Sequence, residues 1–270
     1  AGDKAGAIAA FEQVITLAGS LGDEAAEALT NAKTYIPQIM SSIAKDLIKE
    51  KKYDEGIAQF EAAVAKAAEF GTNSDLADEL AELRPQVLKQ KANGFFAAKA
   101  YANALPALQA VVAADTTDGS SWLRIATILG GSSKVDEALA AYDKAINNGQ
   151  KAQAEKAAST LLVKEAQKAI QAKNSKDGLA AAEKSYNYLS NANACKMAAS
   201  AATKLNNNKA AIEWYEKYLE VSPNAKDAAG IMTTIAVMAQ QAGDKAKAKE
   251  YYTKVQDDPQ YGATAKEQLK

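Results

Sequence analysis

The chain has 270 residues, with 32 basic and 33 acidic side chains and a formal net charge of −1. Proteins that bind nucleic acid carry a basic stripe that neutralises phosphates, so this balance argues against a nucleic-acid partner. Histidine is absent and Cys195 is the sole cysteine, which rules out an internal disulfide and removes the usual general bases and metal ligands. We therefore expect no enzyme, no catalytic residue, no metal and no cofactor.

Alanine dominates the composition, with 62 of 270 residues, while only five prolines and fifteen glycines interrupt the helix-forming residues. Because alanine has the highest intrinsic helix propensity, this composition predicts an all-α fold. No run of about 18 apolar residues is present, so no segment is expected to span a membrane.

One phrase recurs seven times along the chain: a small residue, a bulky one four positions later, and a mostly small or apolar one three positions after that. The phrases begin at Ala7, Gly56, Ala104, Ala138, Gly178, Ala211 and Ala248, which are 49, 48, 34, 40, 33 and 37 positions apart. The fifth phrase is degenerate, because Ala182 and Ser185 stand where larger groups are expected. This spacing and period are typical of stacked pairs of helices.

The first phrase follows a segment that is nearly duplicated at the other end of the chain, since residues 2–7 (GDKAGA) match residues 243–248 (GDKAKA). At both places glycine can end one helix in the left-handed conformation while aspartate caps the next helix. We therefore expect Asp3 to begin the second helix of a pair, and the array to start in the middle of a repeat.

Two longer units follow, because Ile36–Met40 recurs as Arg84–Leu88 at an offset of 48 positions. Each proline-containing segment comes after an acidic helical stretch. We favour two long first helices that kink at Pro37 and Pro85, since an internal proline removes one hydrogen bond. The alternative is that each proline starts a new helix in its first turn.

The second half predicts shorter pairs of helices. Their expected ranges are 122–129 with 135–148, 152–173 with 176–190, 192–205 with 209–221, and 225–242 with 245–256. Ser133 is expected to cap the helix that begins at Val135. The predicted organisation is one domain over 1–270, with extended repeats in 1–115, shorter repeats in 116–256 and a capping helix in 260–270.

These residues resemble tetratricopeptide repeats, in which two antiparallel helices carry characteristic large and small positions. The matching positions are Trp122, Ile125, Ala126 and Leu129 with Ala138, Tyr142 and Ala145; Cys195, Ala198, Ala199 and Ala202 with Ala211, Tyr215, Tyr218 and Pro223; and Met232, Ile235, Ala236 and Ala239 with Ala248, Tyr252 and Val255. The resemblance implies a right-handed α–α superhelix of about six and a half repeats, two of them variants of roughly 48 residues.

The phrase also predicts which large side chains are buried. We expect Phe60, Tyr142, Tyr215 and Tyr252 to lie in the core, and Cys195 to serve as a small buried hydrophobe. Trp122 is expected to pack internally as well. Trp214 is also expected to pack internally, with a surface position as the alternative because it adjoins Tyr215.

The resemblance implies a non-catalytic scaffold whose concave groove, lined by the first helix of each pair, binds a peptide or a partner protein. The groove candidates are Gln86, Lys89, Asn93, Arg124, Thr127, Gln167, Gln171, Lys196, Ser200, Lys204 and Gln241. Their basic and amide groups would suit an acidic segment or a peptide backbone, whereas the simpler interpretation is a solvated polar face. Lys89 and Asn93 match half of the carboxylate clamp of some family members, and Arg124 and Lys164 do not complete it.

A second hypothesis is a structural, self-associating component of a cell-envelope assembly, in which an open apolar face on the first helix forms homo-oligomers. The start at Ala1 rather than methionine favours a trimmed N-terminus, and with it the periplasm or envelope over the cytoplasm.

Overall fold

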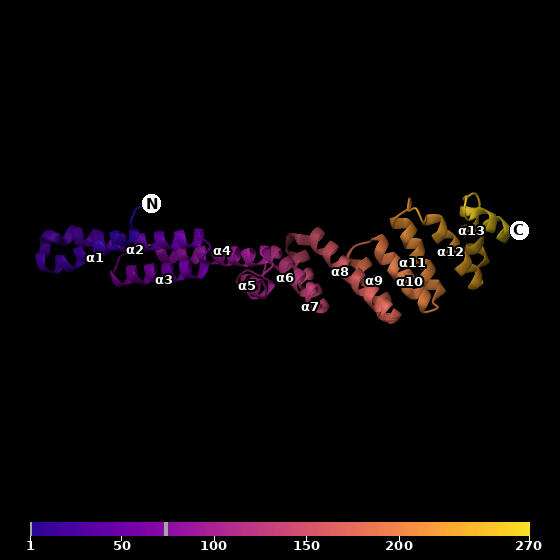
Figure 1. Ribbon diagram of the computed structural model, residues 1–270, viewed down its shortest axis with the longest axis horizontal. Coiled ribbons are helices and arrows are strands. Elements are labelled where there is room, and N and C mark those ends of the chain that lie inside the picture. The colour runs from indigo at the N-terminus through magenta and orange to yellow at the C-terminus, as the bar shows by residue number, and fades with distance from the viewer. Residues whose placement is uncertain (1, 73–74) are drawn as a thin grey trace. The chain divides into compact units, whose positions relative to one another are not determined.

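The structure is a computed structural model that describes residues 2–72 and 75–270. Every regular element within these two ranges is helical, and Figure 1 shows the helices in chain order. The predicted all-α, helical-repeat fold class is confirmed. None of the helices in these ranges has both the length and the apolarity that crossing a lipid bilayer requires. The chain forms two compact units, which divide between Arg124 and Ile125.

The first unit is built from long helices. It contains α1 (Lys4–Leu21), a 3-10 turn (Gly22–Ala25), α2 (Ala26–Lys49), α3 (Tyr53–Glu69), α4 (Leu76–Ala97), α5 (Tyr101–Ala114) and the start of α6 (Gly119–Gly131). Helix α2 packs against α1 and α3, and α4 packs against α3 and α5. Pro37 lies inside α2 and Pro85 inside α4, so the predicted long helices are confirmed and the alternative, that these prolines start new helices, is wrong.

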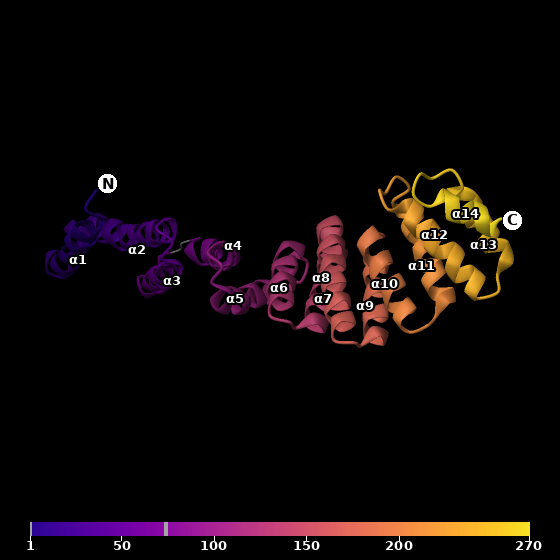
Figure 2. The same ribbon diagram turned by 45° about the vertical axis from the view of Figure 1, so that its right-hand side comes forward.

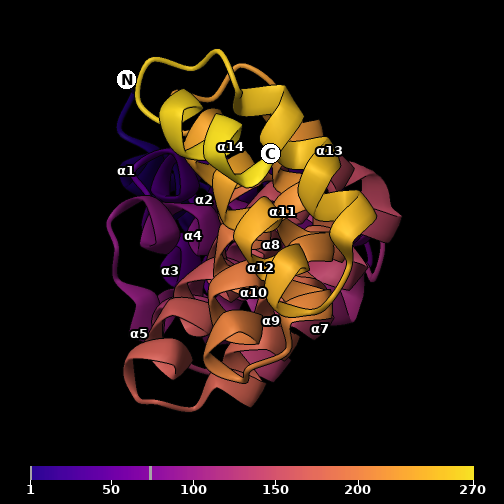
Figure 3. The same ribbon diagram turned by 90° about the vertical axis from the view of Figure 1, so that its right-hand side faces the viewer.

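The second unit continues with shorter helices. After the rest of α6 it contains α7 (Val135–Ala145), a π-helical segment (Ile146–Gln150), α8 (Lys151–Gln171), α9 (Ser175–Tyr188), α10 (Ala192–Lys204), α11 (Asn208–Val221), α12 (Ala228–Gln241), α13 (Lys245–Val255) and α14 (Gly262–Gln268). From α7 to α14 each helix packs against the next, and α8 also contacts α10 (Figure 2). Figure 3 looks onto the C-terminal end, where α12, α13 and the short α14 lie.

The turns inside the pairs share one geometry. Each has a single residue with φ between +56° and +81°; these residues are Lys51, Lys99, Ser133, Lys173, Asn206 and Gly243. The following N–H donates to a carbonyl five positions earlier, as from Lys52 to Leu47 at 2.9 Å and from Asp244 to Ala239 at 2.9 Å. This is the Schellman motif, which ends a helix and reverses the chain.

The helix ends test three predictions about caps. Asp3 and Asp244 cap α1 and α13 as expected, because each side chain accepts a hydrogen bond from the backbone N–H three residues later. Gly243 ends α12 in the left-handed conformation as expected. The predicted cap at Ser133 is wrong: Ser133 is itself the left-handed residue of its turn, and Lys134 occupies the cap position without a side-chain hydrogen bond.

Two helices fall short of a predicted end by three residues. The helix expected over 135–148 ends at Ala145, and Asn148 and Gly149 leave the helical region, Gly149 with φ +84°. Asparagine and glycine are weak helix formers, and glycine tolerates a positive φ at no steric cost. The helix expected over 225–242 begins only at Ala228, after a loop that Pro223 and Asn224 open.

The core consists of alanines that let helices approach closely and a few large rings that fill the remaining space. Phe60, Tyr142 and Tyr252 are 0%, 4% and 3% exposed, and Cys195 is fully buried, so these predictions are confirmed. Tyr215 is a correction because it is only half-buried. The neighbouring Trp214 is buried instead and packs edge-on against Tyr186 at 5.3 Å between ring centroids. Trp122 is half-buried.

Candidate functional site

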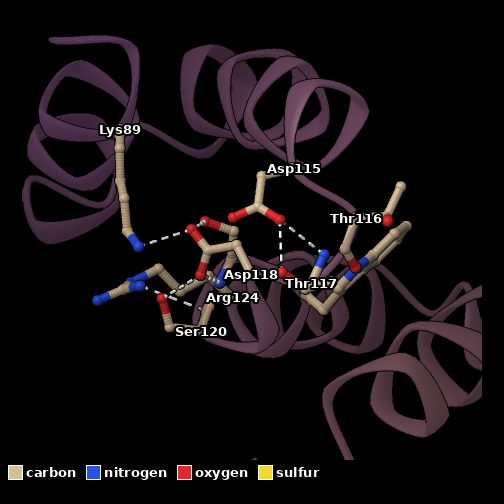
Figure 4. A network of polar contacts seen from close by, with 9 residues as sticks. Lys89, Asp115, Thr116, Thr117, Asp118, Ser120 and Arg124 are labelled. Carbon is tan, nitrogen blue, oxygen red and sulfur yellow. Dashed lines mark hydrogen bonds and ion pairs between the residues drawn. The ribbon is translucent and has the colours of Figure 1, made fainter. Parts of the chain in front are cut away.

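A network of polar contacts joins α4 to the start of α6 (Figure 4). Asp118 caps α6: its Oδ1 accepts from the Ser121 backbone N–H at 3.2 Å and from Ser120 Oγ at 2.6 Å. Its Oδ2 accepts from Ser121 Oγ at 3.1 Å and from Lys89 Nζ at 2.8 Å. The Asp118 side chain is only 5% exposed. Burial alone would raise its pKa, but the hydrogen bonds from Lys89, Ser120 and Ser121 outweigh burial and hold the pKa at about 2.

The loop before α6 is ordered by a second aspartate. Asp115 Oδ1 accepts from the backbone N–H of Thr117 at 2.9 Å and from its hydroxyl at 2.6 Å, and these bonds lower the pKa of Asp115. Trp122 Nε1 donates to the Thr116 carbonyl at 3.0 Å. These bonds order the loop that leads into Asp118.

A pocket of about 290 Å³ lies beside this network. Its lining residues are Pro85, Gln86, Leu88, Lys89, Val111, Ala114, Asp115 and Asp118. Two predicted groove residues, Gln86 and Lys89, thus line one pocket. Arg124 lies on the same network, where its Nη1 donates to the Ser120 carbonyl at 3.3 Å and its guanidinium lies 5.7 Å from the Phe96 ring centroid.

Asn93 lies one helical turn after Lys89 on α4. Its Oδ1 is buried and accepts no hydrogen bond from the residues that the structure describes. Of the predicted site residues in the first unit, Lys89 and Arg124 therefore share a network, whereas Asn93 does not join it.

The second unit repeats the contact between a first helix and the cap of the next first helix. Lys196 of α10 reaches Asp227, the residue before α12, with Nζ 2.6 Å from Oδ2, and Tyr218 donates to Oδ1 at 2.6 Å. The hydrogen bond to Asp227 raises the pKa of Lys196, and the one from Lys196 lowers the pKa of Asp227. Between α8 and α10, Asn191 Nδ2 donates to Ser159 Oγ at 2.9 Å.

We call these three contacts (Lys89–Asp118, Ser159–Asn191 and Lys196–Asp227) the inter-pair clasps. In each, a polar residue on one first helix binds an Asp or Asn 29 to 32 positions later, at the start of the next first helix. Sequence reasoning assigned Lys89 and Lys196 to a ligand and missed their internal partners. The similar offsets, all close to one repeat in length, were the signal that could have revealed them.

The remaining predicted residues lie on the first helices of the second unit. Gln167 and Gln171 are exposed on α8, Lys204 is exposed and Ser200 half-buried on α10, and Thr127 and Gln241 are exposed on α6 and α12. Gln241 also lines a pocket of about 370 Å³ together with Gly230, Thr233, Thr234, Val237, Met238 and Tyr261. A smaller pocket of about 210 Å³ lies between α8 and the start of α10, lined by Lys156, Ser159, Thr160, Val163, Leu189, Asn191 and Asn193.

The described ranges contain no group of three or more His, Cys, Asp or Glu side chains that could hold a metal ion. Cys195 is buried, and burial raises the pKa of its thiol to about 11. A thiol in that state is a poor nucleophile.

Comparison with known proteins identifies one segment. Residues 192–225, which span α10 and α11, match the family model of the tetratricopeptide repeat, so the resemblance predicted from sequence is confirmed for this segment. No curated protein sequence matches the chain.

Solved structures with a similar arrangement include two MamA structures. One is 14% identical, with a TM-score of 0.38, and the match covers 67% of this chain and 94% of that one. The other, from Desulfovibrio magneticus RS-1, is 17% identical, with a TM-score of 0.36 and coverages of 63% and 92%. YrrB, described as a TPR protein with an unusual peptide-binding site, is 14% identical, with a TM-score of 0.38 and coverages of 71% and 97%. Likenesses this remote carry no argument about a ligand or a partner.

Proposed function

Because residues 192–225 form a tetratricopeptide repeat, a module of protein–protein interaction, we propose that this chain is a non-catalytic scaffold. Its first helices α8, α10 and α12 bind an extended segment of a partner protein on their exposed side. The absence of histidine and the buried Cys195 support the non-catalytic part of the proposal.

The observation that carries this proposal is that each of these first helices has one buried side and one exposed side. On α8, Ala166 and Ile170 are buried while the adjacent Gln167 and Gln171 are exposed. On α10 and α12 the buried positions are Ala198, Ala202, Ile235 and Ala239, and the exposed ones include Lys204 and Gln241. Helix formation and packing do not require amides at the open positions. Amide side chains both donate and accept hydrogen bonds, which suits the backbone of an extended peptide.

Charge on this side favours an acidic partner. Lys196 is compensated by Asp227, so it adds little net charge. Lys164 on α8 and Lys204 on α10 are exposed, and neither forms an ion pair within the part of the chain that the structure describes. We propose that these two lysines select carboxylates on the bound segment.

The test is binding to a synthetic array of acidic, neutral and basic peptides of equal length. We expect acidic peptides to be retained, and the double reversal Lys164→Glu with Lys204→Glu to weaken that binding about tenfold, since two exposed ion pairs become repulsive. Lys196 stays unchanged because it supports α12. The matched control is Lys176→Glu with Lys209→Glu, which makes the same charge change on the exposed first turns of α9 and α11.

The control should bind as the wild type does. Equal losses in both double variants would mean that net charge alone drives binding, and no loss in either would contradict the assignment of this surface. Circular dichroism of each variant shows whether the fold is retained.

A further inference from the structure

The two units carry opposite net charges that nearly cancel over the whole chain. Residues 1–124 contain 12 basic and 17 acidic side chains, and residues 125–270 contain 20 basic and 16 acidic ones. The formal net charge is therefore −5 for the first unit and +4 for the second. Because opposite charges attract over about 10 Å at about 0.1 M salt, the first unit of one copy attracts the second unit of another.

Lysines of the second unit gather where its pairs of helices reverse. The turns between α8 and α9, α10 and α11, and α12 and α13 lie on one edge of this unit (Figure 2). Exposed lysines lie in or beside these turns, and we call them the lysine edge: Lys173, Lys176, Lys209 and Lys245. None of the four forms an ion pair within the part of the chain that the structure describes.

The two acidic residues beside the lysine edge already have partners in the fold. Asp244 caps α13 by accepting a hydrogen bond from the Lys247 backbone N–H at 3.0 Å. Asp177 Oδ2 accepts a hydrogen bond from Asn174 Nδ2 at 2.5 Å. The edge has four lysines against these two carboxylates, so it keeps an excess of positive charge.

A surface of opposite charge lies at the start of α4, in the extension that distinguishes the longer repeats of the first unit. We call Asp75, Asp78 and Glu82 the acidic face, because their spacing of three and four residues places them on one side of the helix. All three are exposed, whereas Leu76 and Leu80 between them are buried. Among the described residues, none of the three acids forms an ion pair.

The fold alone does not account for all of this charge. The helix dipole favours acidic residues only in the first turn, so it explains Asp75 and Asp78 but not Glu82. Asp78 and Glu82 are like charges four positions apart, an arrangement that destabilises a helix. A cationic surface bound against the acidic face would remove this repulsion.

We propose that the lysine edge of one copy of this chain binds the acidic face of a second copy. The complementary charge is supplied by the chain itself, so the contact needs no other partner. It joins two different surfaces and is therefore a heterologous contact. The lysine edge lies in the turns and second helices, outside the exposed side of α8, α10 and α12 that is proposed to bind peptides, so the two proposals are independent.

The first test is sedimentation equilibrium of the whole chain at two salt concentrations. We expect an average mass above the monomer's 28.4 kDa at about 0.01 M salt and the monomer at about 1 M salt, because the screening length falls from about 30 Å to about 3 Å. The chain has no histidine, so its side-chain charges, and with them the association, should stay constant between about pH 6 and pH 8. A monomer at both salt concentrations, or an oligomer that salt does not dissociate, overturns the proposal.

Two charge-reversed variants test which surfaces meet. Lys176→Glu with Lys209→Glu alters the lysine edge, and Asp78→Lys with Glu82→Lys alters the acidic face. Each variant alone should stay monomeric at low salt. An equal mixture should associate, because the first variant keeps its acidic face and the second keeps its lysine edge. A mixture that remains monomeric overturns the proposal, as does association of either variant alone to the extent seen in the wild type.

The matched control is Lys156→Glu with Lys226→Glu. It makes the same change in the charge of the second unit at two exposed lysines that lie outside the lysine edge, and it should still associate at low salt. If it becomes monomeric just as Lys176→Glu with Lys209→Glu does, the assignment to the lysine edge is wrong. Circular dichroism of each variant confirms that all of these exposed substitutions leave the fold intact.

Discussion

Replacing Asp118 by asparagine tests whether the inter-pair clasps stabilise the stack. The carboxyl has a pKa of about 2 in the folded chain, against an ordinary value of 3.8. This depression of the pKa corresponds to roughly 2 kcal/mol of stability at neutral pH. The Asp118 side chain is 5% exposed, so screening by solvent leaves most of this value. The Asp118→Asn variant keeps the shape of the cap and removes the charge that Lys89 faces.

The pH dependence follows from the direction of the shift. Because the folded pKa is depressed, the contribution is complete above the unfolded value near 4 and is lost as the pH falls toward about 2. By pH 3, about half of this contribution should be gone. The difference between wild type and Asp118→Asn should therefore be largest at pH 7 and shrink between pH 4 and pH 2.

Urea unfolding at several pH values measures this difference. Trp122 reports on the loop directly, because its ring donates to Thr116, and a Trp214→Phe background removes the second tryptophan signal. The reasoning is refuted if Asp118→Asn matches the wild type at pH 7, or if the difference between them is unchanged between pH 7 and pH 3.

Three further predictions concern the core, the turns and the thiol. Tyr252→Ala should lower the free energy of unfolding, measured with denaturant, by about 3–5 kcal/mol because the ring is 3% exposed. Tyr252→Phe loses only the hydrogen bond to Gln240 and should lower it by about 1 kcal/mol. Equal losses in the two variants would contradict the burial of the ring. Lys173→Gly should raise stability by up to about 1 kcal/mol, since Lys173 has φ +62°, and an unchanged or lower melting temperature would count against a strained turn. Cys195 should react with a thiol reagent only after denaturation, because it is buried and its pKa is about 11; rapid labelling of the folded chain would show that the thiol is accessible.

Most of the fold could be predicted from sequence because the signal is periodic. The phrase that begins at Gly56, Ala138 or Ala248 places a small residue where the two helices of a pair approach each other, and each copy of the phrase gives the same prediction. Local rules also identified the caps at Asp3 and Asp244, where one side chain and one N–H decide the geometry. The same rules failed at Ser133, since the left-handed position of a Schellman turn accepts residues other than glycine in this chain.

The site was less accessible from sequence because it depends on contacts between pairs. Lys89 and Lys196 have the residue type and helix face expected of ligand-binding groups, and only the three-dimensional structure places Asp118 and Asp227 against them. The partial burial of Tyr215 is likewise outside the pattern, because the phrase marks Tyr215 and Tyr252 alike, yet only Tyr252 is fully in the core.

Nuclear magnetic resonance of the chain with an acidic peptide from the array tests the proposed binding surface most directly. We predict saturable shifts in the side-chain amide signals of Gln167, Gln171 and Gln241 and in the backbone signal of Lys204, while the exposed residues of α9 and α11 stay unchanged. Shifts confined to α9 and α11, with those four residues unmoved, would contradict a scaffold that binds its partner on the first helices.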